Sequence, residues 1–133
     1  RLDILESDLR AILAKDAKNA QALNALGYTL ADRTDRYQEA LGYIEQALAL
    51  LPDDAAVLDS MGWVQFRMGN AAKALEFLRR AYQLNPDPEI AAHLSEVLWT
   101  AGQRDEAKKI WRESLDKNPD SPYLRKVQER LGW

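Results

Sequence analysis

His93 is the only histidine of the chain, and Ser95 and Glu96 follow it within three residues. A histidine can act as a general base for a serine hydroxyl when a carboxylate orients its ring. Residues two or three apart on a helix need not share the geometry that this arrangement requires, and no sequence motif supports it. There is also no cysteine that could serve as a nucleophile. We therefore expect no enzymatic activity, and a half-exposed helical histidine at this position.

Two acidic clusters raise the question of a metal site: Asp53 with Asp54, and Asp87 with Glu89. Neither has the alternating oxygen ligands and central glycine of a calcium-binding loop. Both lie just before an expected helix, where a carboxylate can accept hydrogen bonds from free backbone amides and complement the helix dipole. A glycine-rich phosphate loop is absent from the sequence as well. We predict helix capping for these carboxylates, and neither a metal nor a cofactor.

The charge of the chain argues against a nucleic-acid partner. Its 133 residues include 18 lysines and arginines and 21 aspartates and glutamates, so the formal net charge is -3. No basic stripe could neutralise a run of phosphates. No apolar run reaches the roughly 18 residues that a membrane span needs, and we expect no direct membrane insertion. The amino end is unlike a signal peptide and begins within an amphipathic helix, which favours a fragment of a longer protein.

The elements that position these residues follow from an internal repeat. Five features recur three times in the same order: a pair of residues that ends in a small one, an alanine, a bulky residue, a small residue and a proline. They are Leu26-Gly27, Met61-Gly62 and Leu94-Ser95; Ala40, Ala74 and Ala107; Ile44, Leu78 and Trp111; Ala47, Ala81 and Ser114; and Pro52, Pro86 and Pro119. Within each unit, apolar residues recur at spacings of three and four, which predicts two amphipathic helices.

Glycine and proline mark the expected helix ends. Gly69 and Gly102 stand where the first helix of a pair must stop, and the prolines, 34 and 33 residues apart, cannot continue a preceding helix. This period and the order of the recurring residues resemble the tetratricopeptide repeat (TPR). The resemblance covers almost the whole chain. It implies an all-α fold, a right-handed α-solenoid of antiparallel helix pairs.

The resemblance divides residues 1–133, a single TPR domain, into five segments. They are the second helix of a preceding repeat at 1–17, repeats at 20–53, 55–87 and 88–120, and a C-terminal cap helix at 122–131. Small residues should let the helices of a pair approach, while the bulky ones fill the space toward the next pair. One extra residue between Gly27 and Ala40 predicts a splayed pair or a bulged turn. Ser95, in place of glycine, predicts slightly looser packing.

In the resembled family, the first helix of each pair lines a concave groove that holds segments of other proteins. By resemblance, this stripe comprises Gln21, Asn24, Tyr28, Asp32, Asp59, Trp63, Phe66, Arg67, His93, Glu96 and Trp99. Nine of them are our candidate partner-binding residues: Asn24, Tyr28, Asp59, Trp63, Phe66, Arg67, His93, Glu96 and Trp99. Trp63 and Phe66 would form an apolar floor between Tyr28 and Trp99. Burial of both rings against the neighbouring repeat is the open alternative.

The other two tryptophans carry separate expectations. Trp111 recurs with Ile44 and Leu78 and is assigned to the core, whereas Trp133 is expected to be disordered or to dock on a neighbouring protein. One branch of the family grips a partner's terminal carboxylate with Lys, Arg and Asn side chains. We do not expect that clamp, because the corresponding positions hold Asn24, Tyr28, Asp59 and Trp63.

Residues 24–34, 58–69 and 91–99 are similar to the carboxyl-terminal repeats of TPR lipoproteins of the proteobacterial envelope. One member of that group is an adaptor for a carboxyl-terminal processing protease. The resemblance implies a scaffold or adaptor for a protein or peptide segment, located in the periplasm and attached to the outer membrane through a missing N-terminal region. A cytoplasmic location is the alternative, since the absence of cysteine suits both compartments. A second functional hypothesis is an assembly module of a secretion or pilus apparatus that self-associates through its open ends.

Overall fold

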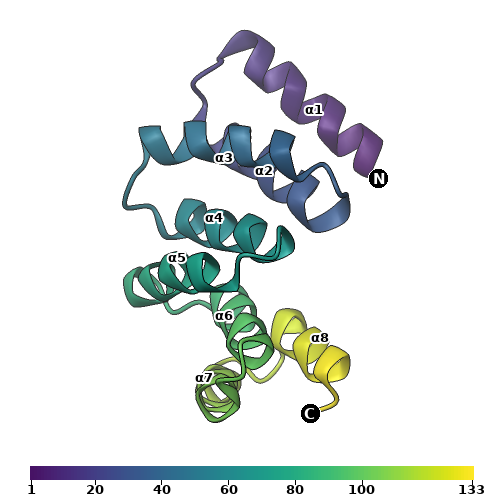
Figure 1. Ribbon diagram of the computed structural model, residues 1–133. Coiled ribbons are helices and arrows are strands. Elements are labelled where there is room, and N and C mark those ends of the chain that lie inside the picture. Colours follow the sequence, from purple (N-terminus) through teal and green to yellow (C-terminus); the bar gives the residue numbers. More distant parts are fainter.

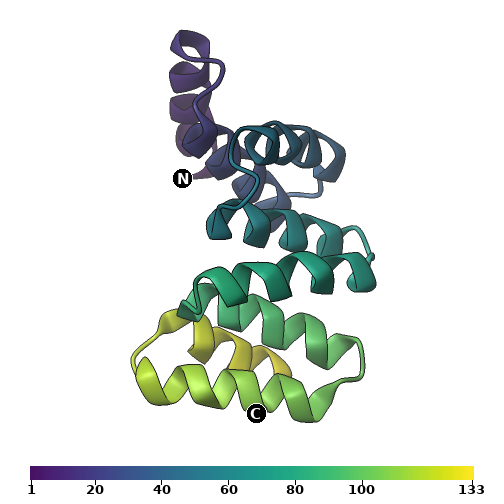
Figure 2. The same cartoon turned by 90° about the vertical axis from the view of Figure 1, so that its left-hand side faces the viewer.

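The computed structural model describes all residues, 1–133, and contains eight α-helices and no strand. The helices are α1 (Leu2–Lys15), α2 (Ala20–Arg33), α3 (Tyr37–Leu50), α4 (Ala55–Arg67), α5 (Ala71–Leu84), α6 (Pro88–Thr100), α7 (Arg104–Lys117) and α8 (Pro122–Leu131). Consecutive helices from α2 to α7 form antiparallel pairs that stack along one axis, with α1 at one end and α8 at the other (Figure 1). The view in Figure 2 shows the same stack from the side. The expected all-α solenoid is confirmed.

Four helices begin at a polar side chain that accepts a hydrogen bond from the backbone amide three residues later. Asp54 and Asp87 accept these bonds at 3.0 and 2.9 Å. Asn19 and Ser121 cap α2 and α8 in the same way. Pro122 then occupies the first turn of α8, where its missing amide hydrogen has no cost. The capping prediction is confirmed for Asp54 and Asp87.

Left-handed glycines end the first helices of the second and third pairs. Gly69 has a φ of 89° and Gly102 a φ of 88°, a conformation that other residues adopt only with strain. The amide of the following residue then reaches a carbonyl five residues earlier, from Asn70 to Gln65 at 2.8 Å and from Gln103 to Leu98 at 2.9 Å. These bonds satisfy carbonyls that a helix end otherwise leaves free.

The extra residue of the first repeat lengthens α2. This helix has 14 residues, whereas α4 and α6 have 13 each. Thr34 follows it in extended conformation, with a φ of -138°, and its amide donates a helical hydrogen bond to the Leu30 carbonyl at 3.1 Å. The expectation of a splayed pair or a bulged turn was wrong, because one more helical residue accommodates the insertion.

Glycine allows close approach within the first two pairs. A Cβ atom on Gly27 would lie 2.5 Å from Cγ1 of Ile44, and one on Gly62 would lie 2.6 Å from Cγ of Leu78. Both bulky side chains are fully buried. They therefore pack against the small residue of their own pair, and they also share core clusters with residues of the next pair, as expected.

The third pair uses different residues at the same positions. Ser95 is fully buried, and its hydroxyl donates to the Ala92 carbonyl at 3.0 Å. Trp111 is buried too, and its Nε1 donates to the Leu124 carbonyl of α8 at 2.9 Å. The assignment of Trp111 to the core is confirmed. Its indole also fixes α8 against the last pair.

Trp133 folds back onto the protein. Its ring meets those of Trp99 and Trp111 edge-on, at centroid distances of 5.1 and 5.2 Å. This geometry is a favourable one for aromatic pairs. The expectation that Trp133 is disordered or docks on another protein was wrong, because its own chain supplies the aromatic partners.

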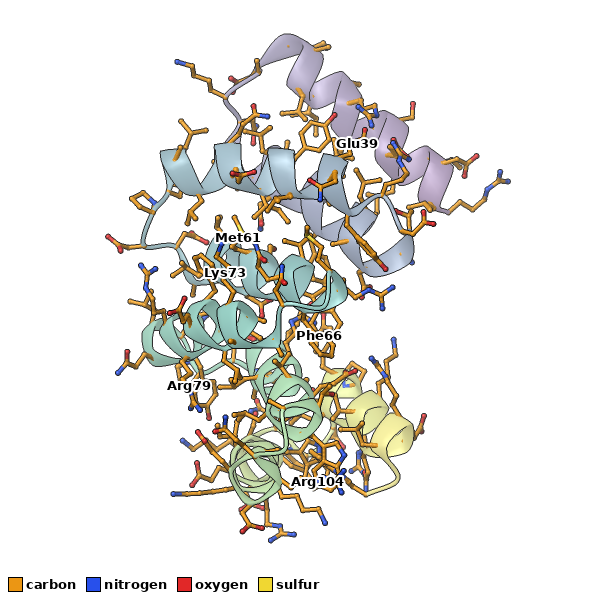
Figure 3. All side chains as sticks on the ribbon, in the orientation of Figure 1. Glu39, Met61, Phe66, Lys73, Arg79 and Arg104 are labelled. Atoms are coloured by element: carbon orange, nitrogen blue, oxygen red, sulfur yellow. The ribbon has the colours of Figure 1, made fainter.

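α1 packs on α2 through the buried Leu9 and is joined to α3 by ion pairs. Glu6 contacts Arg36 at 3.0 Å, and Arg10 contacts Glu39 at 2.7 Å; Figure 3 shows Glu39 on the side of α3 next to α1. Next to Leu9, α1 exposes three large apolar side chains: Ile4, Leu5 and Ile12. None of the eight helices combines the length and the apolar composition that crossing a bilayer requires.

Candidate functional site

Four helices, α2, α4, α6 and α8, line a pocket of about 150 Å³. The first helices of the three pairs, α2, α4 and α6, thus share this pocket with α8, which follows the last pair at one end of the stack (Figure 1). We call it the concave pocket, because the first helices are expected to line the concave face. Its lining residues are Tyr28, Asp32, Trp63, Ala92, His93, Glu96, Tyr123, Lys126, Val127 and Arg130. Four of these are among the nine candidates: Tyr28, Trp63, His93 and Glu96.

Trp63 is part of both the pocket and the core. The side chain is only 3% exposed, and its ring stacks on that of His93 with centroids 4.1 Å apart. Its Nε1 donates to Asp32 of α2 at 3.1 Å, so the polar atom of the buried indole has a partner. The two alternatives left open for this residue, groove and core, are therefore not exclusive.

His93 is only 8% exposed, which corrects the expectation of a half-exposed histidine. Its Nδ1 donates to Asp59 of α4 at 2.9 Å, and its Nε2 lies 3.2 Å from the Tyr28 hydroxyl of α2. Burial lowers the pKa of His93, but the charge of Asp59 and its hydrogen bond outweigh burial and raise that pKa above its ordinary value. The ring therefore connects three helices.

Carboxylates surround the Tyr28 hydroxyl. Burial raises the pKa of Tyr28, and the negative charges of Asp32, Glu89 and Asp59 raise it further. Burial also raises the pKa of Glu89, whose half-buried carboxyl has no ion-pair partner. The charge of Glu89 is in turn the main cause that raises the pKa of Tyr123 on α8. Glu89 thus acts on tyrosines from both walls of the pocket.

α8 forms the wall that sequence reasoning missed. Arg130 contacts both oxygens of Glu96 at 2.8 and 3.1 Å, while Tyr123 and Lys126 are exposed at the pocket. The sequence predicts this segment only as a C-terminal cap helix, and none of the nine candidate residues lies on it. A usable signal existed, because α8 occupies the position of a first helix in a fourth pair. Its groove-facing stripe could therefore have been inferred at the same spacing as those of α2, α4 and α6.

Two further candidates support the pocket from behind or beside it. Asp59 lies behind His93 and holds its Nδ1. Phe66 is partly buried, and its ring lies 5.3 Å from that of Trp63; Figure 3 labels it near the end of α4. A third candidate, Asn24, does not line the pocket: it is half-buried on α2, and its Oδ1 has no hydrogen-bond partner.

Arg67 and Trp99 do not line the pocket. The Arg67 guanidinium lies over the ring of Tyr37, 5.7 Å from its centroid. Trp99 lies beneath Arg104 and Lys108, at 4.5 and 5.5 Å, in the aromatic cluster with Trp133 described above. The expected floor from Tyr28 to Trp99 is therefore interrupted, since Trp99 packs at the end of the solenoid instead.

A second hollow, of about 460 Å³, lies between α3, α4 and α5. It contains none of the candidate residues. Its lining comprises Leu41, Glu45, Leu48, Ala49, Met61, Gln65, Lys73 and Phe77. Met61 and Lys73, labelled in Figure 3, mark its place in the stack. Its walls are mostly apolar.

His93, Ser95 and Glu96 are not arranged as a general base, a nucleophile and an orienting carboxylate. The Ser95 hydroxyl is buried and bonded to a carbonyl of its own helix, while the carboxylate of Glu96 faces Arg130. Both nitrogens of His93 are engaged by other residues. What the concave pocket can do is bind, because it offers aromatic rings and charged groups held in fixed positions.

Comparison with known proteins identifies the repeat. Two family models match the chain, both described as tetratricopeptide repeat, over residues 20–87 and 65–131. A TPR repeat-containing protein of Pseudomonas aeruginosa is 58% identical over 92 residues, which are 69% of this chain and 16% of that protein. The Vi polysaccharide export protein of Salmonella typhi is 32% identical over 126 residues, 91% of this chain and 19% of that protein. The chain thus spans less than a fifth of these relatives.

A solved structure supports the fold. The crystal structure of a thermophilic TPR protein from Thermus thermophilus superimposes with a TM-score of 0.79. The match covers 96% of this chain and 72% of that one, at 24% sequence identity. At this identity the likeness concerns the arrangement of the helices.

Proposed function

We propose, on the premise that this chain belongs to the tetratricopeptide repeat family, that it is a non-catalytic scaffold that binds a segment of a partner protein on its concave face. Repeats of this family generally act as protein–protein interaction scaffolds. The observation that carries the proposal is the pocket lined by α2, α4, α6 and α8. It lies where the first helices of successive repeats converge.

The pocket is organised before any partner arrives. Trp63 is held by Asp32, and His93 is held by Asp59. Rings that are already fixed lose little conformational entropy on binding, so their contacts contribute more fully to affinity. Buried aromatic residues at the centre of a contact surface also tend to dominate binding energy. The aromatic pocket therefore suits a partner's side chain as an anchor point.

The finer proposal is an adaptor in the bacterial periplasm that presents substrates to a processing protease. A segment outside this chain would attach it to the outer membrane. Its support is the similarity of residues 24–34, 58–69 and 91–99 to repeats of envelope lipoproteins, together with the bacterial relative that is 58% identical. Within this proposal, the concave pocket holds either the protease or its substrate.

One observation favours a second function, that of an assembly module of a secretion or pilus apparatus. Ile4, Leu5 and Ile12 are 53%, 37% and 43% exposed on one face of α1. In a solenoid, an apolar end face of this kind packs against another helix. That helix would be the preceding helix of a longer chain or, if the protein is an assembly module, a helix of a second copy or another subunit. In the latter case the protein would act through its end and not through its concave face.

Site-specific photo-cross-linking in cells that make the full-length protein tests these functions. A photoreactive residue at position Tyr123 probes the concave pocket, and one at Lys109, exposed on α7, is the matched control. A third, at Ile4, probes the end face. We expect a defined adduct from Tyr123 that is absent from Lys109. Mass spectrometry of that adduct then identifies the partner.

The three positions give distinguishable results. A protease or its substrate linked at Tyr123 supports the adaptor. An adduct of the chain with itself at Ile4, without one at Tyr123, supports the assembly module instead. Equal adducts at Tyr123 and Lys109 would contradict a specific concave site, because random collision labels all exposed positions alike.

A further inference from the structure

The concave pocket has aromatic walls from three helices. Tyr28 comes from α2, Trp63 from α4 and Tyr123 from α8. Trp63 is fixed by its hydrogen bond to Asp32, while Tyr123 is 44% exposed at the mouth. Aromatic ring faces carry a negative partial charge that attracts cations, and indole and phenol rings are the strongest of the side chains in this respect.

Four carboxylates lie in or beside these walls, and only two have a cationic partner. Asp59 is paired with His93, and Glu96 with Arg130. The other two, Asp32 and Glu89, form no ion pair. One oxygen of Asp32 accepts the Trp63 indole hydrogen, which leaves the second oxygen free.

Glu89 does not line the pocket itself, but it is the half-buried carboxylate of this group that forms no ion pair. Its charge acts on the hydroxyls of both Tyr28 and Tyr123. Burial raises the pKa of Glu89 more than the charge of His93 and the hydrogen bond from Tyr28 lower it, so its ionised form is only partly compensated, and a cation bound next to it reduces that cost. The only uncompensated cation of the lining is Lys126, which is exposed on α8. One Lys126 cannot neutralise both Asp32 and Glu89.

The size of the pocket limits what can enter. Its volume of about 150 Å³ is well below the roughly 300–1,000 Å³ of sites for drug-sized ligands. It suits the head of one long side chain. A guanidinium is planar, stacks on aromatic rings and pairs with carboxylates through two hydrogen bonds, and an ammonium can meet the same groups as a point charge.

We propose that this pocket binds one basic side chain, an arginine or a lysine of the partner segment, between Tyr28, Trp63 and Tyr123 and against the free carboxylates of Asp32 and Glu89. This inference rests on the proposed function, because it names the partner chemistry of that same site. The cation stacks on the ring of Tyr123 at the mouth and reaches the half-buried ring of Tyr28. Its charge compensates Glu89, and the aliphatic stem of the side chain lies along Val127 of α8.

Lys126 has a defined role in this arrangement. Its ammonium is attracted by the same carboxylates, so it competes with an incoming basic side chain from the opposite wall. Removal of Lys126 should therefore strengthen binding of a basic ligand. If the pocket instead selects an acidic side chain, removal of Lys126 should weaken binding. Whether removal of Lys126 strengthens or weakens binding therefore distinguishes a pocket for basic side chains from one for acidic side chains.

The test uses three acetylated, amidated pentapeptides that differ only in the central residue: arginine, citrulline or glutamate, each between pairs of alanines. Citrulline keeps the shape of arginine without its charge. Binding to this chain is followed by NMR through the indole N–H of Trp63, assigned with Trp63→Phe. We expect the arginine peptide to bind about tenfold more tightly than the citrulline peptide. The glutamate peptide should leave the Trp63 signal unmoved.

Single-residue variants test which side chains cause the preference for the arginine peptide. Glu89→Gln should weaken the arginine peptide about tenfold, Lys126→Ala should tighten it about threefold, and Lys109→Ala on α7 should change nothing. Asp32→Asn retains an oxygen acceptor for Trp63 and provides a second test if Glu89→Gln perturbs the fold. Far-UV circular dichroism of each variant checks that its helices are retained.

Three results would overturn the inference: equal binding of the arginine and citrulline peptides, tighter binding of the glutamate peptide, or no response to millimolar arginine peptide. Each of them leaves the proposed function standing, because cross-linking from Tyr123 detects a partner whatever its chemistry. Conversely, arginine-peptide binding without any cross-linked partner at Tyr123 would support the pocket chemistry and contradict the scaffold function.

Discussion

The indole of Trp63 and the imidazole of His93 stack with centroids 4.1 Å apart and planes inclined by 22°. Each ring is also held by a carboxylate, Trp63 by Asp32 and His93 by Asp59. The four residues belong to the first helices of three successive pairs. The same contacts therefore join neighbouring repeats and shape the concave pocket, so changes at this site affect stability as well as binding.

Replacement of Trp63 by alanine should destabilise the chain by about 3–5 kcal/mol, because it leaves a cavity in a buried contact between repeats. Trp63→Phe keeps a ring on His93 and loses the hydrogen bond to Asp32, which should cost about 1 kcal/mol beyond the change in packing. Urea unfolding followed by far-UV circular dichroism measures both free energies of unfolding.

Tyr123→Ala is the matched control for Trp63→Ala. It removes an aromatic ring from the same pocket, but the side chain is 44% exposed, and the change should stay within about 0.5 kcal/mol. An equal effect of the two substitutions would contradict the stacked arrangement of Trp63 and His93.

His93 should make the chain less stable as the pH rises above its ordinary pKa of 6.5. Although burial lowers the pKa of His93, the charge of Asp59 and its hydrogen bond raise it, so the folded chain binds this proton more tightly than the unfolded chain. The stabilisation is complete below about pH 6.5 and is lost as the pH passes through the folded-state pKa. Unfolding free energies measured from about pH 6 to about pH 9 should therefore fall.

The variant His93→Gln isolates this contribution. Its amide cannot take up a proton, so its stability should vary less with pH across the same range. NMR titration of the His93 ring provides a direct check, since a folded-state pKa below 6.5 would reverse the predicted slope.

The repeat could be predicted from the sequence because its markers act through the backbone. Gly69 and Gly102 close helices, and Gly27 and Gly62 admit Ile44 and Leu78, whatever the rest of the chain does. The effect of such residues depends on the local backbone and not on distant contacts, and their regular spacing reveals the stack of helix pairs. The all-α solenoid follows from them directly.

The environment of His93 could not be predicted in the same way. Its partners Asp59 and Tyr28 come from two other helices, and the rotation of one helix against the next decides whether they meet. Periodicity specifies which residues share a stripe but not how stripes from different helices align. Trp133 shows the same limit, because its contacts depend on how α8 docks against Trp111.

The ion pairs of Glu6 should hold α1 against the rest of the chain, and this attachment should weaken at low pH. Hydrogen bonds from Arg36 and Arg10 lower the pKa of Glu6 from 4.5 to about 2. Their contribution is present above about pH 4.5 and is lost as the pH falls through about 2. Amide hydrogen exchange in Arg36→Gln should be faster in α1 and unchanged in α6. Uniformly faster exchange would mean that the pair supports the whole chain and not this end alone.

The approach of α4 and α5 depends on the absence of a side chain at Gly62. A Cβ there would lie 2.6 Å from Cγ of Leu78 and 3.1 Å from the backbone oxygen of Ala74. Because the backbone of α5 cannot yield without moving the helix, Gly62→Ala should destabilise the chain by about 1–3 kcal/mol. Thermal and urea unfolding measure this loss.

Gly42→Ala in α3 is the contrasting control, since a Cβ at that position meets nothing within 4 Å. There the substitution should stabilise the chain by about 0.5–1 kcal/mol, because alanine loses less backbone entropy than glycine in a helix. The pair therefore predicts opposite signs of the stability change for the same chemical change.

A double variant tests the contact between Gly62 and Leu78. In Gly62→Ala with Leu78→Ala, the smaller side chain makes room for the new methyl group, and the combined loss of stability should be less than the sum of the two single losses. Strict additivity would mean that Gly62 and Leu78 are not in contact in solution.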